Sequence, residues 1–262
     1  MHDMPLSKDP GDSMHRVAAA LLLLAAPAAF AYTAAELAAK NVEAKGGREK
    51  LNALQSLRMT GKLRVNGGAI EVDYVVLVER PRAIRYEEQL QGLTRVAAYD
   101  GSQAWQINPF QGRKDPEKLS ADDAKALGED AADFTGALVD YEAKRYKLDY
   151  LGTEDIDGTE AHKLRVTRPN GDVTFVYLDP DYFLEIRTVN LRIEHGVPNE
   201  TVTEYGDYEK VNGVYLPFAL ESYPKGSSDR EKLQIDKAEA NVATDKSLFE
   251  FPAPHPAAAT PK

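Results

Sequence analysis

The side chains that most often do chemistry are scattered in this sequence. After residue 31 there are three histidines, His162, His195 and His255, and their spacing matches no metal-binding motif such as H-E-x-x-H. The chain contains no G-x-S-x-G turn, phosphate-binding loop or G-x-G-x-x-G segment. It also contains no cysteine, which excludes disulfides, thiolate metal sites and a cysteine nucleophile.

Acidic residues offer further candidates, and a turn or a solvated strand explains each of them better. The segment EDIDGTE, residues 154–160, has acidic residues at alternate positions before a glycine but lacks the later ligands of a calcium loop. Asp179 and Asp181 flank a proline, which favours a turn over acid–base catalysis. The nearest approach to a polar cluster in a cleft is the charged set Arg82, Arg85, Glu87 and Glu88. We therefore expect no enzyme activity, no metal and no cofactor.

The N-terminus has the pattern of a cleaved secretory signal peptide. His15 and Arg16 precede an apolar run from Val17 to about Phe30, and Ala31 completes a signal-peptidase site. The run is too short for a membrane span, and the polar residues before Met14 make that methionine a candidate true start. We expect residues 1–31 to be removed and the mature protein to be periplasmic, without a stable membrane anchor.

Length and charge narrow the class of protein further. The 262 residues carry a net charge of −10 at pH 7, which argues against nucleic acid as a partner and leaves local basic patches open. We expect a monomer with one domain over residues 32–248, since single β-barrels reach about 200–250 residues. The proline- and alanine-rich tail, residues 249–262, is expected to be disordered.

From Leu57 onward the sequence predicts an antiparallel meander. Turn dipeptides such as Asn66-Gly67 and Asp100-Gly101 separate apolar or alternating runs, as in two-residue hairpins. The predicted strands span residues 57–65, 69–79, 82–90, 93–99, 103–108, 146–154, 159–168, 173–179, 183–194, 200–210, 214–223 and 231–240. The fold class is thus α+β, mainly antiparallel β, with about 11–12 strands.

Four short helices are expected beside these strands. A capping box at Thr33 begins a helix that runs to about Lys45, where two glycines end it, and a second helix covers residues 48–55. Ser120 can cap a third helix ending at Gly128, and residues 130–144 can form a fourth. The last two interrupt the strand series, so we expect them to cross an open face of the sheet.

One sheet face is strongly apolar, as Val214, Leu216, Phe218 and Leu220 show on one predicted strand. A long antiparallel sheet with such a face curls into a barrel or half-barrel, and the face must be covered. The expected helices are too few for a packed layer. The sequence therefore predicts a barrel or half-barrel with short helices as a lid over an apolar cavity.

Two motifs resemble the LolA family of periplasmic lipoprotein carriers. Residues 100–110, DGSQAWQINPF, are similar to the family's D-G-x-x-x-W-x-x-N-P-F stretch, and residues 78–82, VERPR, to its V-K-R-P-N segment. The rest of the chain agrees in topology rather than in motif. The added helix at residues 46–55 and the charge-rich strands after Gly152 depart from the carrier and resemble the broader set of LolA-like exported proteins.

The resemblance implies an unclosed barrel whose lidded cavity holds the acyl chains of a lipoprotein in transit to the outer membrane. The family's R-P arginine bonds the lid, so Arg80 is the expected lid latch, with a solvated strand-end residue as the alternative. The expected cavity residues, some of which can equally be ordinary core, are Val72, Tyr74, Val76, Trp105, Phe110, Phe134 and Leu138.

The resulting hypothesis is a carrier or binder of a lipoprotein or another acylated ligand. Its partners would include an inner-membrane transporter and an outer-membrane receptor. Two alternatives stay open. One is a structural or interaction module with a filled interior, and the other is an enzyme acting on envelope lipid or peptide.

Overall fold

The computed structural model describes residues 32–194 and 196–252, which form one antiparallel sheet with three α-helices. The predicted signal peptide, His195, His255 and residues 253–262 lie outside the described residues. The α-helices are α1 (Ala34–Ala44), α2 (Arg48–Ala53) and α3 (Ala121–Ala132). The strands are β1 (Ser56–Val65), β2 (Ile70–Glu79), β3 (Ala83–Leu90), β4 (Leu93–Tyr99), β5 (Ala104–Asn108), β6 (Arg113–Lys118), β7 (Lys147–Ile156), β8 (Thr159–Thr167), β9 (Val173–Leu178), β10 (Glu185–Glu194), β11 (Val197–Val211), β12 (Val214–Pro224) and β13 (Glu231–Ala240).

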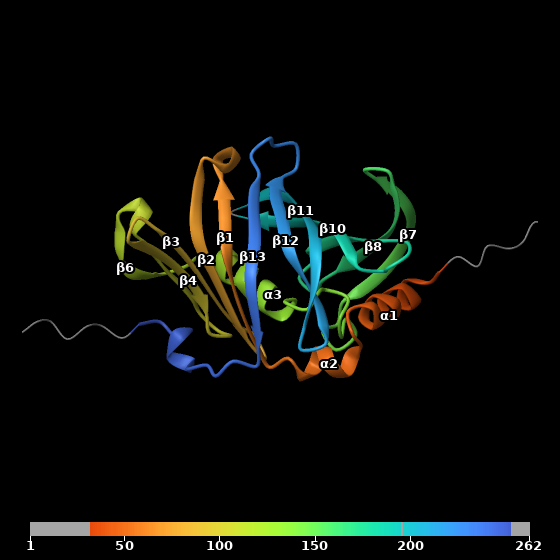
Figure 1. Ribbon diagram of the computed structural model, residues 1–262, viewed down its shortest axis with the longest axis horizontal. Helices are drawn as coiled ribbons and strands as arrows, with labels where there is room; N and C mark the ends of the chain where they lie inside the picture. The colour runs from red at the N-terminus through yellow and green to blue at the C-terminus, as the bar shows by residue number, and fades with distance from the viewer. Residues whose placement is uncertain (1–31, 195, 253–262) are drawn as a thin grey trace, which may run out of the picture. The chain divides into compact units, whose positions relative to one another are not determined.

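Two meanders meet at one seam in this sheet. Its strand order is β6-β5-β4-β3-β2-β1-β13-β12-β11-β10-β9-β8-β7, so every neighbour is sequential except the pair β1 and β13 (Figure 1). We call β1–β6 the first arm and β7–β13 the second arm. The edge strands β6 and β7 follow one another in the chain, and the segment between them contains α3. The predicted unclosed half-barrel is confirmed.

Each of the twelve predicted strands overlaps a strand of the structure, and β6 is the one that the sequence did not predict. Its residues, RKDPEK, are charged and include Pro116. A proline donates no hydrogen bond, so it suits the outer side of an edge strand, and charges there discourage further pairing. The apolar alternation that marks buried strands is therefore absent from β6.

The helix caps follow the sequence, whereas the lid helices differ from it. Thr33 and Glu36 form the predicted capping box of α1, and Ser120 caps α3. However, α3 continues through Gly128 to Ala132, and residues 133–145 form turns in place of a helix over 130–144. Gly128 provides space, since a Cβ there would lie 3.1 Å from Tyr99 Cε1. Gly136 has a φ of +105°, which ends any helix at that point.

The sheet face that carries the helices, which we call the concave face, holds three apolar clusters, each under a different helix. Leu127 and Ala131 of α3 pack on Val76, Val78 and Ile84 of the first arm. In the second arm, the side chains of α1 pack on β8 and β9, and those of α2 pack on β12 and β13. Strand β12 presents the predicted row of apolar side chains to this core, in contact with the α2 cluster. The short helices therefore cover both arms of the sheet.

The opposite face of the sheet, the convex face, is covered over β4 and β5 by the C-terminal segment. Trp105 and Val96 pack there with Phe251, and the Trp105 indole Nε1 donates a hydrogen bond of 2.7 Å to the carbonyl oxygen of Phe249. Phe249 is 2% exposed. The expectation of a disordered tail starting at residue 249 is wrong for residues 249–252, because these aromatic side chains have an apolar surface to bury.

Candidate functional site

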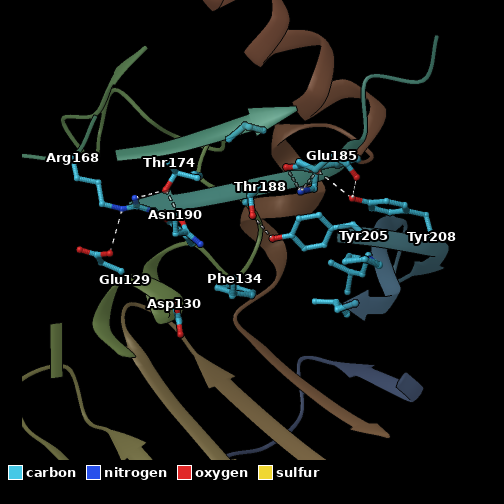
Figure 2. A pocket seen from close by; sticks show the side chains of 18 of the residues that line it. Glu129, Asp130, Phe134, Arg168, Thr174, Glu185, Thr188, Asn190, Tyr205 and Tyr208 are labelled. Atoms are coloured by element: carbon cyan, nitrogen blue, oxygen red, sulfur yellow. Dashed lines mark hydrogen bonds and ion pairs between the residues drawn. The ribbon is translucent and has the colours of Figure 1, made fainter. Parts of the chain in front are cut away.

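A cavity of about 250 Å³ lies on the concave face, between the end of α3 and the strands of the second arm (Figure 2). Its apolar wall comes from both arms. It includes Met59 of β1, Phe134, Val176 of β9, and Leu216 and Leu220 of β12. Most of the remaining wall is polar or charged, with contributions from β10, β11 and the segment after α3.

One end of the cavity is closed by a group of ion pairs that we call the carboxylate clamp: Glu129, Asp130, Asp133, Arg168 and Arg192. Glu129 Oε2 lies 3.1 Å from Arg192 Nε and 3.7 Å from Arg168 Nε. Arg168 Nη2 donates to Asp133 Oδ2 at 2.8 Å, and Arg192 Nη2 lies 3.5 Å from Asp130 Oδ1. The acids belong to α3 and its C-cap, whereas Arg192 belongs to β10, so the clamp joins the lid helix to the second arm.

Burial dominates the electrostatics of the clamp. The side chains of Glu129 and Arg168 are 8% and 5% exposed. Burial raises the pKa of Glu129, although Arg168 and Arg192 oppose the change. Burial likewise raises the pKa of Asp130, which accepts a 3.4 Å hydrogen bond from the Tyr86 hydroxyl. Every clamp carboxylate contacts an arginine, so the group is suited to holding two elements together.

A second polar group lies at the other end of the cavity (Figure 2). Lys45, the C-cap of α1, donates to both carboxylate oxygens of Glu185 at 2.8 and 2.9 Å, and both side chains are buried. The Tyr208 hydroxyl donates to the Glu185 carbonyl oxygen at 2.8 Å. A Cβ at Gly136 would lie 2.8 Å from both charged groups, and the φ of +105° at this position also favours glycine. This ion pair anchors α1 and the segment after α3 to β10.

The structure separates most of the sequence-predicted cavity residues. Phe134 lines the cavity, and Tyr74 and Val76 pack beside it under α3. Val72 is buried further along β2, and Leu138 packs in the cluster under α1.

Two predicted residues lie away from the cavity. Trp105 points to the convex face. Side chains alternate along β5, and Ala104 packs with α3 on the concave face, so Ala104 and Gln106 lie on the face opposite Trp105. Phe110 lies in a 3₁₀ turn and is 42% exposed. These two placements correct the sequence-based expectation for the stretch from residue 100 to 110.

Arg80 contacts the helical cover, although at α2 rather than α3. Its Nε donates to the Leu54 carbonyl oxygen at 2.8 Å and its Nη2 to the Leu51 carbonyl oxygen at 3.2 Å. Its guanidinium also lies 4.9 Å from the ring centroid of Phe134. Arg80 therefore connects the end of β2 to α2 and to the segment that follows α3.

The charged residues of the cavity were missed in the sequence because they come from distant segments. The one available signal is on β10, where Thr188, Asn190 and Arg192 alternate with apolar residues and face the cavity. The charged residues Arg82, Arg85, Glu87 and Glu88 do not form one cluster in a cleft. Arg85 pairs with Glu87 and contacts the convex-face residue Trp105, whereas Glu88 pairs with Arg95.

Two further properties concern the described residues only. In residues 32–194 and 196–252, no helix is both long and apolar enough to cross a membrane. In the same ranges, no three histidine or acidic side chains are grouped so that they could hold a metal ion.

The fold is that of the LolA-like proteins. A LolA superfamily protein from Nitrosomonas europaea is similar over 84% of this chain and 99% of its own, with a TM-score of 0.58 and 16% identity. An outer membrane lipoprotein-sorting protein domain from Vibrio parahaemolyticus is similar over 82% of this chain and 95% of its own, with a TM-score of 0.56 and 10% identity. No protein-family model and no curated protein sequence matches the chain.

Proposed function

We propose that this protein binds and carries an acylated or otherwise apolar ligand in the periplasm. The observation that carries the proposal is the cavity enclosed between the concave face and the segment after α3, with its wall of Met59, Phe134, Val176, Leu216 and Leu220. The LolA-like fold supports it. In its fuller form, the proposal is lipoprotein sorting to the outer membrane, with an inner-membrane transporter and an outer-membrane receptor as partners.

Ligand entry would require the lid to move. Each buried CH₂ group of an acyl chain contributes about 0.8 kcal/mol, so a chain of ordinary length can supply the free energy for opening. The cavity of about 250 Å³ is smaller than the roughly 300–1,000 Å³ typical of ligand pockets. We infer that the carboxylate clamp and Arg80 hold a closed, empty form, which the ligand opens.

Gentle isolation from the periplasm followed by mass spectrometry tests the proposal, with recovery of bound lipid or lipopeptide expected. Purified protein should also bind a fluorescent fatty acid, and Ala137→Trp, which fills the cavity, should abolish that binding. Ala69→Trp is the matched control, because Ala69 is exposed in the turn between β1 and β2. Recovery without apolar ligand, together with equal binding by both variants, would count against a carrier.

A second candidate is a periplasmic interaction module without lipid cargo. The observation that favours it is the small size of the cavity, whose two ends are occupied by the clamp and the Lys45–Glu185 pair. This candidate predicts that the fatty acid fails to bind the wild-type protein while the protein remains folded. We propose no catalytic role, since the clamp carboxylates all contact arginines.

A further inference from the structure

A second cavity, of about 510 Å³, shares Glu129 and Arg168 with the first. It is formed by the turns that begin β3 and end β4, the outer side of α3, the segment before β7 and the turn between β8 and β9. Both arms of the sheet therefore contribute to it, and the clamp forms the wall between the two cavities.

The second cavity is strongly basic in an otherwise acidic protein. Glu129 is the one carboxylate among its described lining residues, and the cations are Arg82, Lys125, Lys144, Arg145 and Arg168. Lys125 lies 2.9 Å from Asp172 and Lys144 lies 2.8 Å from Asp133, so these two lysines are partly neutralised. A net charge of −10 for the chain makes this local excess of positive charge unexpected.

Three arginines in the cavity have unused capacity to bind an anion. Within the described ranges, neither Arg82 nor Arg145 has a carboxylate at ion-pair distance, and Arg82 makes only a long hydrogen bond, 3.4 Å, to the Gly128 carbonyl oxygen. Arg168 is 6% exposed, yet its Nε makes no hydrogen bond. Glu129 Oε2 forms an ion pair with this group but lies 3.7 Å from the nitrogen, beyond hydrogen-bond distance, so the buried N–H can still donate to an anion.

We propose that this second cavity binds a phosphate-bearing group. Planar guanidinium groups bind phosphate oxygens through paired hydrogen bonds, and Arg82 and Arg145 supply them from separate segments. The group is either the headgroup of a phospholipid or a soluble phosphate ester. The assignment goes beyond the proposed carrier function and does not rest on it, because the cations bind the anion whether or not an acyl chain enters the first cavity.

Titration calorimetry with three probes tests this assignment: glycerol 3-phosphate, monomeric lysophosphatidylglycerol, and a monoacylglycerol of the same chain length. The double variant Arg82→Gln/Arg145→Gln removes two cations from the cavity, and both side chains are exposed, so the fold should survive. Arg58→Gln/Arg64→Gln is the matched control, since it removes the same charge from β1 and leaves the cavity intact.

Phosphate-dependent binding that weakens about tenfold or more in the cavity variant, and not in the control, supports the site. Binding of glycerol 3-phosphate identifies a soluble ester as sufficient, whereas binding of the lysophospholipid alone identifies a lipid headgroup. Equal affinities in both variants, or no phosphate-dependent binding to the wild type, overturn the assignment. Monoacylglycerol has an acyl chain but no phosphate, so its binding tests the first cavity alone. Failure of the carrier proposal can therefore be distinguished from failure of the phosphate-site proposal.

Discussion

Glu129 of α3 and Arg192 of β10 meet at the end of the interior cavity, with Glu129 Oε2 3.1 Å from Arg192 Nε. The helix lies in the segment that follows the first arm, and the strand belongs to the second arm. Their side chains are 8% and 14% exposed, so the pair is shielded from screening by salt. This contact makes the lid helix part of a bridge between the two arms.

Arg192→Gln should loosen that bridge. The variant leaves the buried Glu129 with less compensating charge, and breaking a buried ion pair costs about 3 kcal/mol or more. Urea unfolding should show the loss, and hydrogen exchange of α3 amides should become faster. Arg165→Gln breaks an exposed pair with Asp149 and should cost less than about 1 kcal/mol. Equal losses in the two variants would contradict a structural role for the clamp.

The clamp also predicts the direction of a pH effect. Burial raises the pKa of Glu129 above its ordinary value of 4.5, so the folded protein binds this proton more tightly than the unfolded chain does. The resulting stabilisation is complete below pH 4.5 and disappears as the pH rises through the higher folded-state pKa. Through this group, lower pH should therefore favour the folded protein over the unfolded chain.

Comparison with Glu129→Gln isolates this effect, because the other titrating groups are common to both proteins. The free energy of unfolding of the wild type minus that of the variant should decrease as the pH rises from 4.5 toward neutrality. Urea titrations at several pH values measure it. A difference that increases with pH would show that the arginines, rather than burial, determine the pKa of Glu129.

Arg80→Leu should accelerate ligand exchange. The variant removes two hydrogen bonds to the end of α2 and the contact with the Phe134 ring, so the cover over the cavity should open more often. Stopped-flow measurements with a fluorescent fatty acid should show faster uptake and release. Arg64→Leu, on the exposed end of β1, should leave both rates unchanged. Unchanged rates in Arg80→Leu would remove this residue from the latch.

The single tryptophan reports on the C-terminal segment. Deletion of residues 249–262 removes the Phe249 carbonyl and the Phe251 ring from Trp105, so the indole should become solvated and its emission should shift to longer wavelength. Loss of the buried Phe249 should also destabilise the protein by about 1.5–3 kcal/mol. Deletion of residues 253–262 alone should leave emission and stability unaltered. A red shift in that shorter deletion would indicate further contacts with the indole.

Gly61→Ala should destabilise the seam between β1 and β13. A Cβ at Gly61 would lie 2.1 Å from the Gln234 carbonyl oxygen, at the register shift between the two strands. The backbone must move to admit it, at a cost of about 1–3 kcal/mol. Gly206→Ala on β11 is the control, because its nearest neighbour would be 3.8 Å away. Equal decreases in the thermal unfolding temperature of the two variants would contradict the importance of the seam.

Local patterns in the sequence were enough to predict most elements of this fold. Alternating apolar residues and turn dipeptides located twelve of the strands, and side-chain caps located the starts of α1 and α3. These signals act over a few residues, since they depend on backbone dihedral angles and on hydrogen bonds to near neighbours. The sequence predicted that α3 ends at Gly128, but the glycine is there because Tyr99, which is distant in the sequence, packs closely against it.

The composition of the cavity was decided by the tertiary structure alone. Alternation places Trp105 and Ile107 together on one face of β5, but it cannot say which face becomes concave when thirteen strands curve. The clamp likewise joins Glu129 to Arg168 and Arg192, residues that only strand order brings together. Sequence by itself determined a curved antiparallel sheet with a helical lid. Pairing between distant strands decided that charged side chains close its interior and that the tryptophan lies outside it.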